Sequence, residues 1–266
     1  TDGFSLGDWS PLNASSQTFV SWNWKANGSG SANTDGSISS TVSANTTAGF
    51  SIVTYTGTGA TATVGHGLGV TPKVIIIKGT SNTGSWGTYH SSIGETKKII
   101  LNSTAAEVSS GWMNNTAPTS SVFTVINDAD VGSSGYTYVA YCFAEKKGFS
   151  KFGSYVGNNN TDGIFLYLGF KARFIMIKNI STSTNGDWII YDTARDTDNP
   201  ISSALEANQS QAEVTGTGRG LPLDITSTGI KMRHSYGESN ASSTYIYMAF
   251  AEHPLVSSND IPATAR

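Results

Sequence analysis

Two pairs of aromatic residues are the part of this sequence best suited to binding a ligand. Trp86 and Tyr89 recur as Trp188 and Tyr191, and Asp192 directly follows the second pair. An aromatic ring stacks on the face of a sugar, and neighbouring carboxylates or amides bind its hydroxyl groups. Recurrence at two places is at least as typical of a structural element in a core. Two interpretations therefore stand: a glycan site formed by these five residues, or duplicated core positions.

The histidines are not spaced as metal ligands. His66, His90, His234 and His253 form neither the i, i+4 pair of a helical zinc site nor a His-x-His pair on a strand. Surface or loop positions are the simpler interpretation. We expect no metal site and no cofactor.

Acidic and nucleophilic residues also lack the spacing of an enzyme. The densest acidic segment, residues 192–199, has neither the glycine nor the final glutamate of a calcium loop, and we interpret it as an ion pair of Arg195 with a carboxylate. Cys142 lies in a predicted strand whose second copy has Ala249, which indicates packing. We expect no catalytic residues and no enzymatic activity. Two carboxylates on distant loops, as in a polysaccharide depolymerase, are the alternative that spacing leaves open.

The composition restricts the class of protein further. The chain has 266 residues and a mass of 28.0 kDa, and only 13% of its residues are charged, with a net charge of −3. A basic surface for nucleic acid is therefore not expected. No stretch has the roughly 20 apolar residues of a membrane helix, so membrane insertion is not expected. One cysteine excludes an internal disulfide framework.

An internal repeat is the strongest pattern in the chain. Matched segments keep their order, with small insertions between them. They are 49–51 with 148–150, 68–78 with 168–178, and 137–145 with 244–252. Runs of β-branched and aromatic residues alternate with Gly, Asn, Ser and Thr, which predicts many short strands. We expect an all-β fold of two tandem β-sandwich, jelly-roll-like repeats.

A third, partial copy lies at the front of the chain. Residues 4–6 and 18–25 resemble residues 123–125 and 137 onward, so we expect the chain to start inside an upstream unit. The predicted organisation is terminal strands of that unit over 1–26, a polar linker over 27–48, repeat 1 over 49–146, repeat 2 over 147–256 and a tail over 257–266.

The closing strand of each repeat, over 137–145 and 244–252, has two unlike faces. One face is large and apolar and predicts a core position. The other carries small residues and predicts close approach of another layer or subunit. The small residues expected at a subunit or inter-unit contact are Ala140, Ala144, Ala249 and Ala251. Lys78 and Lys178 each follow an apolar run and are expected at its solvent end.

Several of these motifs resemble a known family. They are Gly49-Phe50-Ser51, His66-Gly67-Leu68-Gly69-Val70-Thr71-Pro72-Lys73, residues 138–145 and Lys151-Phe152-Gly153-Ser154-Tyr155. In these the chain is similar to tandem-repeat β proteins of marine tailed phages, the cyanophage-like and pelagiphage-like viruses. The similarity covers nearly all of residues 1–256. It implies a virion protein, such as a tail fibre, and brings no catalytic residues.

The expected function follows from this resemblance and from the composition. We expect a non-enzymatic structural protein on the virion surface, a tail fibre or appendage that binds a host-surface glycan as its receptor. Its expected partners are further copies of itself in a homotrimer and other virion proteins. The alternatives are a capsid decoration protein or head fibre, and a polysaccharide depolymerase.

Overall fold

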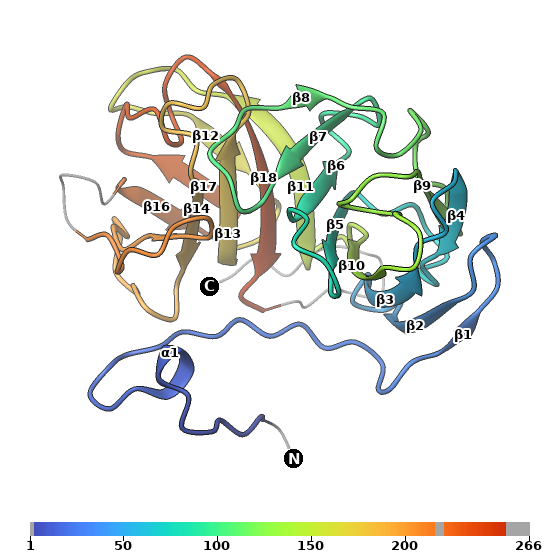
Figure 1. Cartoon of the computed structure of the whole chain (residues 1–266). Helices are drawn as coiled ribbons and strands as arrows, with labels where there is room; N and C mark the ends of the chain where they lie inside the picture. Colours follow the sequence, from blue (N-terminus) through green and yellow to red (C-terminus); the bar gives the residue numbers. More distant parts are fainter. Residues whose placement is uncertain (1–2, 216–220, 254–266) are drawn as a thin grey trace.

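Antiparallel strands make up nearly all of the regular structure (Figure 1). This computed structural model describes residues 3–215 and 221–253. Within those residues the one helix is α1 (Ser10–Asn13), with Pro11 in its first turn. No helix in the described part of the chain has the length and apolar character needed to span a bilayer. The predicted all-β fold is confirmed.

The first repeat is a sandwich of one large and one small sheet. The large sheet has the order β1-β2-β3-β10-β5-β6-β7-β8, and the small sheet pairs β4 with β9. The strands are β1 (Ser31–Asn33), β2 (Ser40–Asn45), β3 (Phe50–Thr56), β4 (Ala62–Gly65), β5 (Val74–Gly79), β6 (Gly87–His90), β7 (Lys97–Ile100), β8 (Val108–Ser109), β9 (Val122–Val125) and β10 (Thr137–Phe143).

The second repeat has the same arrangement. Its large sheet has the order β11-β18-β13-β14-β15, and its small sheet has the order β12-β17-β16. The strands are β11 (Ser150–Val156), β12 (Phe165–Tyr167), β13 (Ala172–Asn179), β14 (Trp188–Asp192), β15 (Leu205–Glu206), β16 (Leu223–Thr226), β17 (Gly229–Met232) and β18 (Thr244–Ala251). The closing strand is central in both, since β10 lies between β3 and β5 and β18 lies between β11 and β13. Two tandem sandwiches are therefore present, as predicted.

The segment predicted as a polar linker, residues 27–48, instead adds strands to the first repeat. It contains β1 and β2, and β2 pairs along β3 with Val42 opposite Val53. Ser40 and Val42 point inward while Thr41 is exposed. Short polar side chains such as Ser and Thr tolerate this alternation, so a composition typical of a linker still forms a strand. The predicted terminal strands of residues 1–26 are not formed either, because residues 3–26 contain α1 and no strand.

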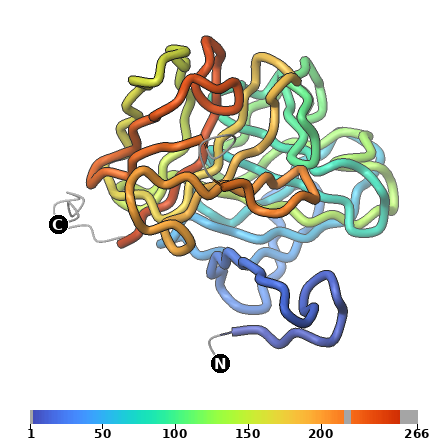
Figure 2. Tube along the Cα trace, turned by 90° about the vertical axis from the view of Figure 1, so that its left-hand side faces the viewer, coloured from blue at the N-terminus to red at the C-terminus, as the bar shows by residue number. Residues whose placement is uncertain are grey.

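Figures 1 and 2 show how the sheets are arranged, and three apolar cores hold them together. One lies between the two sheets of the first repeat, and a second lies between the two sheets of the second repeat. The third contains residues from both large sheets, including Ile76, Phe143, Met176 and Phe250. The order of layers is therefore small sheet, large sheet, large sheet, small sheet. We call the third core the inter-repeat core.

The two faces of the closing strand occupy different cores. Tyr141, Phe143, Met248 and Phe250 belong to the inter-repeat core. The small-face alanines point the other way, into the cores of the separate sandwiches, with Ala140 and Ala144 in the first and Ala249 and Ala251 in the second. Their expected role as a subunit or inter-unit contact is wrong. Small side chains fit here because the same core already holds large rings, such as Tyr55 on β3 and Trp112 in the turn after β8.

Candidate functional site: the contact between the repeats and its open cleft

A buried histidine crosses from the first repeat to the second. His90, at the end of β6, donates from Nε2 to the carbonyl oxygen of Tyr247 on β18, over 3.1 Å. Its Nδ1 accepts the backbone N–H of Ser92 at 3.2 Å. Both ring nitrogens are thus satisfied by a neutral imidazole. Burial lowers the pKa of His90 to about 4, so the ring carries no charge at neutral pH.

A buried lysine crosses in the opposite direction. Lys178 on β13 is fully buried, so its expected position at the solvent end of the strand is wrong. Its ammonium group donates to the carbonyl of Thr104 in the first repeat over 2.9 Å, and also to the carbonyl of Gly186. Burial lowers its pKa to about 8. Lys78, the equivalent residue of the first repeat, donates to Asn82 and Gly84 within its own repeat.

An indole makes the third polar contact. Trp188, at the start of β14, lies in the inter-repeat core and donates from Nε1 to the carbonyl of Ile100 at 3.0 Å. Three polar side chains, His90, Lys178 and Trp188, therefore join the repeats through backbone carbonyls. The backbone N–H of Glu107 in the first repeat also donates to the carbonyl of Ile180 in the second at 3.1 Å. A buried donor that loses its acceptor costs about 1–3 kcal/mol, so these bonds fix one relative placement of the repeats.

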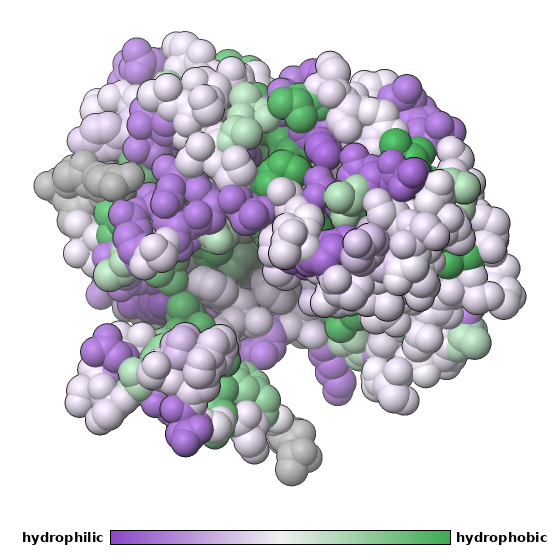
Figure 3. All heavy atoms as spheres, in the orientation of Figure 1, coloured by the Kyte–Doolittle hydropathy of each residue, from purple (hydrophilic) through white to green (hydrophobic). Residues whose placement is uncertain are grey.

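Residues 20–26 cross the open side of this contact as an extended segment. Exposure alternates along it, and Trp22 and Trp24 are half-buried against the inter-repeat core. Two cavities of about 390 Å³ each lie beside the segment. Both are lined mainly by apolar and aromatic residues, Phe174 and the two tryptophans among them. In Figure 3 the surface is hollowed where the segment passes below the body of the molecule.

Asp192 anchors this segment to the second repeat. Its carboxylate accepts the indole N–H of Trp22 at 3.0 Å and the Nε–H of Arg195 at 2.7 Å. Arg195 also forms an ion pair with Glu213. Burial raises the pKa of Asp192, but the hydrogen bonds from Arg195 and Trp22 outweigh burial and the pKa is lowered. The predicted ion pair of Arg195 with a carboxylate is present.

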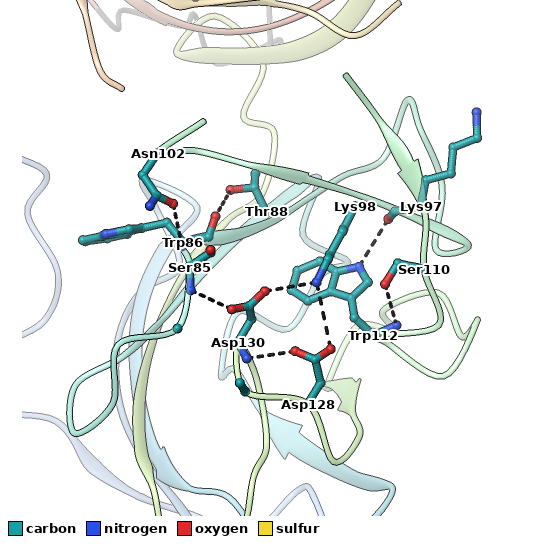
Figure 4. A network of polar contacts seen from close by, with 12 residues as sticks. Ser85, Trp86, Thr88, Lys97, Lys98, Asn102, Ser110, Trp112, Asp128 and Asp130 are labelled. Atoms are coloured by element: carbon teal, nitrogen blue, oxygen red, sulfur yellow. Dashed lines mark hydrogen bonds and ion pairs between the residues drawn. The ribbon is translucent and has the colours of Figure 1, made fainter. Parts of the chain in front are cut away.

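Trp86 forms part of the wall of one cavity. Its half-buried ring stacks on Tyr141, with ring centroids 6.5 Å apart and planes inclined by 13°. Its backbone N–H is held by the side-chain oxygen of Asn102 at 3.0 Å (Figure 4). The neighbouring Ser85 N–H donates to Asp130, which pairs with Lys98 at 3.0 Å. In Figure 4 the indole points away from this polar network, which fixes the backbone beneath it.

The five residues predicted to form a glycan site are not assembled into one. Tyr89 lies in the core of the first sandwich and Tyr191 in the core of the second. Trp188 is buried between the repeats, and Asp192 is buried under Trp22. Only Trp86 remains half-buried at a cavity. Three of the four aromatic residues in the repeated Trp–Tyr pairs therefore occupy core positions, as the second of the two interpretations expects.

His66, His234 and Cys142 also lie in structural positions. His66 and His234 each accept a backbone N–H at Nδ1, from Leu68 and Tyr236 respectively, and burial lowers both pKa values. Cys142 is fully buried, and burial raises its thiol pKa to about 12. Over residues 3–215 and 221–253, no three His, Cys, Asp or Glu side chains are grouped to hold a metal ion. The arrangement suits apolar packing and hydrogen bonding to backbone carbonyls.

Comparison with protein-family models assigns the chain to a family. Residues 1–254 match the Domain of unknown function (DUF7483), so the chain belongs to this family. The match includes the segment before β1 as well as both repeats. Comparisons with curated proteins and with solved structures find no match.

Proposed function

We propose that this protein is a non-enzymatic structural component of a tailed-phage virion, a tail fibre or other appendage on the particle surface. The observation that carries the proposal is the contact between the repeats. One apolar core and several hydrogen bonds, three of them donated by buried side chains, join two sandwiches into a single rigid block. A rigid block of this kind suits a part that holds its shape outside a cell.

The use of the polar side chains supports the same proposal. Three ionisable groups at the contact, His90, Lys178 and Asp192, each hold a backbone or side-chain partner that fixes an element in place. A catalytic acid or base needs a proton-transfer atom directed at substrate. In this protein those atoms form hydrogen bonds with other parts of the chain instead. The similarity of the sequence motifs to virion proteins of marine phages supports a phage particle as the place of this protein.

Recognition of a host glycan is not part of this proposal. Four of the five residues expected to bind a sugar are buried, and a sugar needs an accessible ring face. A receptor site formed by other residues would be a property of the assembled appendage.

Immunogold electron microscopy tests the proposal. Antibody raised against this chain is applied to purified particles of the phage that carries the gene, and gold is expected on the tail or its appendages. Gold on the capsid would support a decoration protein or head fibre instead. Particles without gold, with the antigen confined to the soluble fraction of the lysate, would refute a virion role. Reducing-sugar release from host envelope polysaccharide by the pure protein would refute the absence of enzymatic activity.

A further inference from the structure

The segment before β1 has the sequence of the last part of a repeat. Residues 3–6, Gly-Phe-Ser-Leu, align with residues 229–232, Gly-Ile-Lys-Met, and Asn-Ala-Ser-Ser occurs at both 13–16 and 240–243. Thr18 and the seven residues after it then align with Thr244 and the rest of β18. Residues 3–25 thus correspond to the stretch from β17 to the end of β18. We call residues 3–25 the N-terminal arm.

Core positions of a repeat are exposed in the arm. Ile230, Met232 and Tyr245 are 0% exposed in the second sandwich. Their counterparts in the arm are exposed by 61% at Phe4, 46% at Leu6 and 52% at Phe19. Figures 1 and 2 agree that the first part of the arm lies away from the sheets. The arm therefore carries the apolar side chains of a sandwich whose other strands are not in the described part of the chain.

The end of the arm nevertheless packs beside β10 and β18, in the place that the closing strand of a third unit would take. Trp24 aligns with Phe143 of β10 and Phe250 of β18. The three rings meet in a triangle, with centroids 6.1 Å apart for Trp24 and Phe143, 5.4 Å for Trp24 and Phe250, and 5.9 Å for Phe143 and Phe250. Three equivalent residues thus surround one axis, two from complete sandwiches and one from the arm.

The polar contacts between units follow the same cycle. His90 and Asp192 are equivalent residues, since His90 pairs with Val74 and Asp192 with Phe174 at the same register of the two sheets. His90 of the first repeat bonds to β18, the closing strand of the second. Asp192 of the second repeat bonds to Trp22, in the closing segment of the arm. Each unit therefore contacts the closing strand of the next one.

The third contact of such a cycle would be made at Trp86, and the described part of the chain has no third sandwich there. Trp188 of the second repeat donates its indole N–H to Ile100 of the first, and is buried there. Trp86 has the same backbone anchor, since Asn102 accepts its N–H as Asn208 accepts that of Trp188. Its ring is half-buried and forms the wall of a cavity beside the arm. A third unit would place its counterpart of Ile100 against Trp86.

We propose that the arm and the cleft at Trp86 form a docking surface for a third sandwich of this repeat type, one that lacks its own closing strand. The partner supplies counterparts of β11 to β16 and takes residues 18–25 as its closing strand, which completes a three-unit ring. A head-to-tail contact forms a ring only when its rotation closes, and the triangle of Trp24, Phe143 and Phe250 around one centre indicates closure with three units. A second copy of this chain does not fit, because β10 and β18 already fill the closing positions of its repeats. The proposal does not depend on the proposed function.

An engineered chain with a third unit tests the proposal. A second copy of residues 147–228 is placed directly before Gly3, so that the junction of Thr228 with Gly3 reproduces the junction of Thr228 with Gly229. Hydrogen exchange with mass spectrometry then follows peptides over residues 18–25. We expect their amides to exchange at least about 100-fold more slowly than in the parent chain, because a strand paired on both sides opens only with its sheet.

A matched control adds the complete repeat, residues 147–253, in place of residues 147–228. Its closing position is already filled by β18, so exchange over residues 18–25 should stay as fast as in the parent chain. Equal protection in the two fusions would overturn the proposal, because the effect would then be independent of the missing strand. Exchange that stays fast in both fusions would overturn it as well.

The unmodified chain provides a second, independent test. Phe4→Ser, Leu6→Ser and Phe19→Ser together should leave the melting temperature unchanged, because these side chains have no core to leave. Trp24→Ser should lower it and free the arm to exchange, since Trp24 packs in the triangle. A fall of more than about 5 °C for the triple variant would show that the arm already has its partner within this chain, and would overturn the proposal.

Discussion

Acid should weaken the contact between the repeats through one residue, His90. Its pKa is about 4 in the folded protein, against the ordinary value of 6.5. The unfolded chain therefore binds more protons between pH 6.5 and pH 4, and the free energy of unfolding rises with pH across that window. A difference of 2.5 pKa units corresponds to about 3 kcal/mol. This contribution is present in full above pH 6.5 and is lost as the pH falls to 4.

The variant His90→Gln isolates this effect. Its amide can donate to the Tyr247 carbonyl and accept from the Ser92 N–H, as the imidazole does, but it does not titrate. Urea unfolding of both proteins at pH 4, 5, 6 and 7 gives the difference in free energy at each pH. The wild type should lose about 3 kcal/mol more than the variant between pH 7 and pH 4.

The control for this comparison is His253→Gln, which changes an exposed histidine. That variant should follow the wild type at every pH. Parallel curves for the wild type and His90→Gln would refute the reasoning, because they would mean that His90 accepts a proton equally well in the folded and unfolded chains.

Three further predictions follow from the cores. Relative to Lys178→Met, the wild type should gain about 3 kcal/mol in unfolding free energy as the pH rises from 8 to 10.5, because Lys178 has a pKa of about 8 when folded and 10.5 when unfolded; urea titrations at both pH values measure it. Phe143→Ala should cost about 3–5 kcal/mol, whereas Phe165→Ala, at a side chain 49% exposed, should cost less than about 1 kcal/mol, as read by denaturant midpoints. Cys142 should not react with a thiol reagent until the chain unfolds, which a colorimetric titration with and without denaturant would detect, and rapid labelling of the native protein would contradict its burial.

The strands and their duplication are predictable from sequence because both depend on local pattern. The register in which these strands pair is harder to predict. The motif Gly-Phe-Ser aligns Phe50 with Phe149, but in the sheets Phe50 pairs with Phe143 and Ser150 pairs with Phe250. The stacked tyrosines set this register, since Tyr55 faces Tyr138 and Tyr155 faces Tyr245. Packing across strands therefore outweighs the three-residue motif match and shifts the register by one residue.

The sequence pattern could not predict which core each face of the closing strand enters, for a different reason. A period of two distinguishes the two faces of a strand, and the closing strand does have one large and one small face. Both faces are buried in this fold, one inside a sandwich and one between the repeats. Alternation cannot say which core each face enters, because that depends on the second layer.

The contacts that join the repeats were also not predictable, because their partners are far apart in the chain. His90 and Tyr247 are 157 residues apart, Trp188 and Ile100 are 88 apart, and Lys178 and Thr104 are 74 apart. All three acceptors are backbone carbonyls. Every residue has one, so the type of the accepting residue gives no signal in the sequence. The one sequence signal was the recurrence of Trp and Tyr, and it indicates equivalent positions rather than a shared site.

Divergence at equivalent positions explains why the two repeats cannot exchange places. His90 faces a carbonyl oxygen and must donate, which a neutral imidazole does at Nε2. Asp192, at the same register, faces the indole N–H of Trp22 and must accept, which a carboxylate does. An exchange of these two side chains would place a buried carboxylate against the Tyr247 carbonyl, with no hydrogen to share between the two oxygen groups. Each unit is therefore matched to the neighbour that follows it, and a ring of such units has one order.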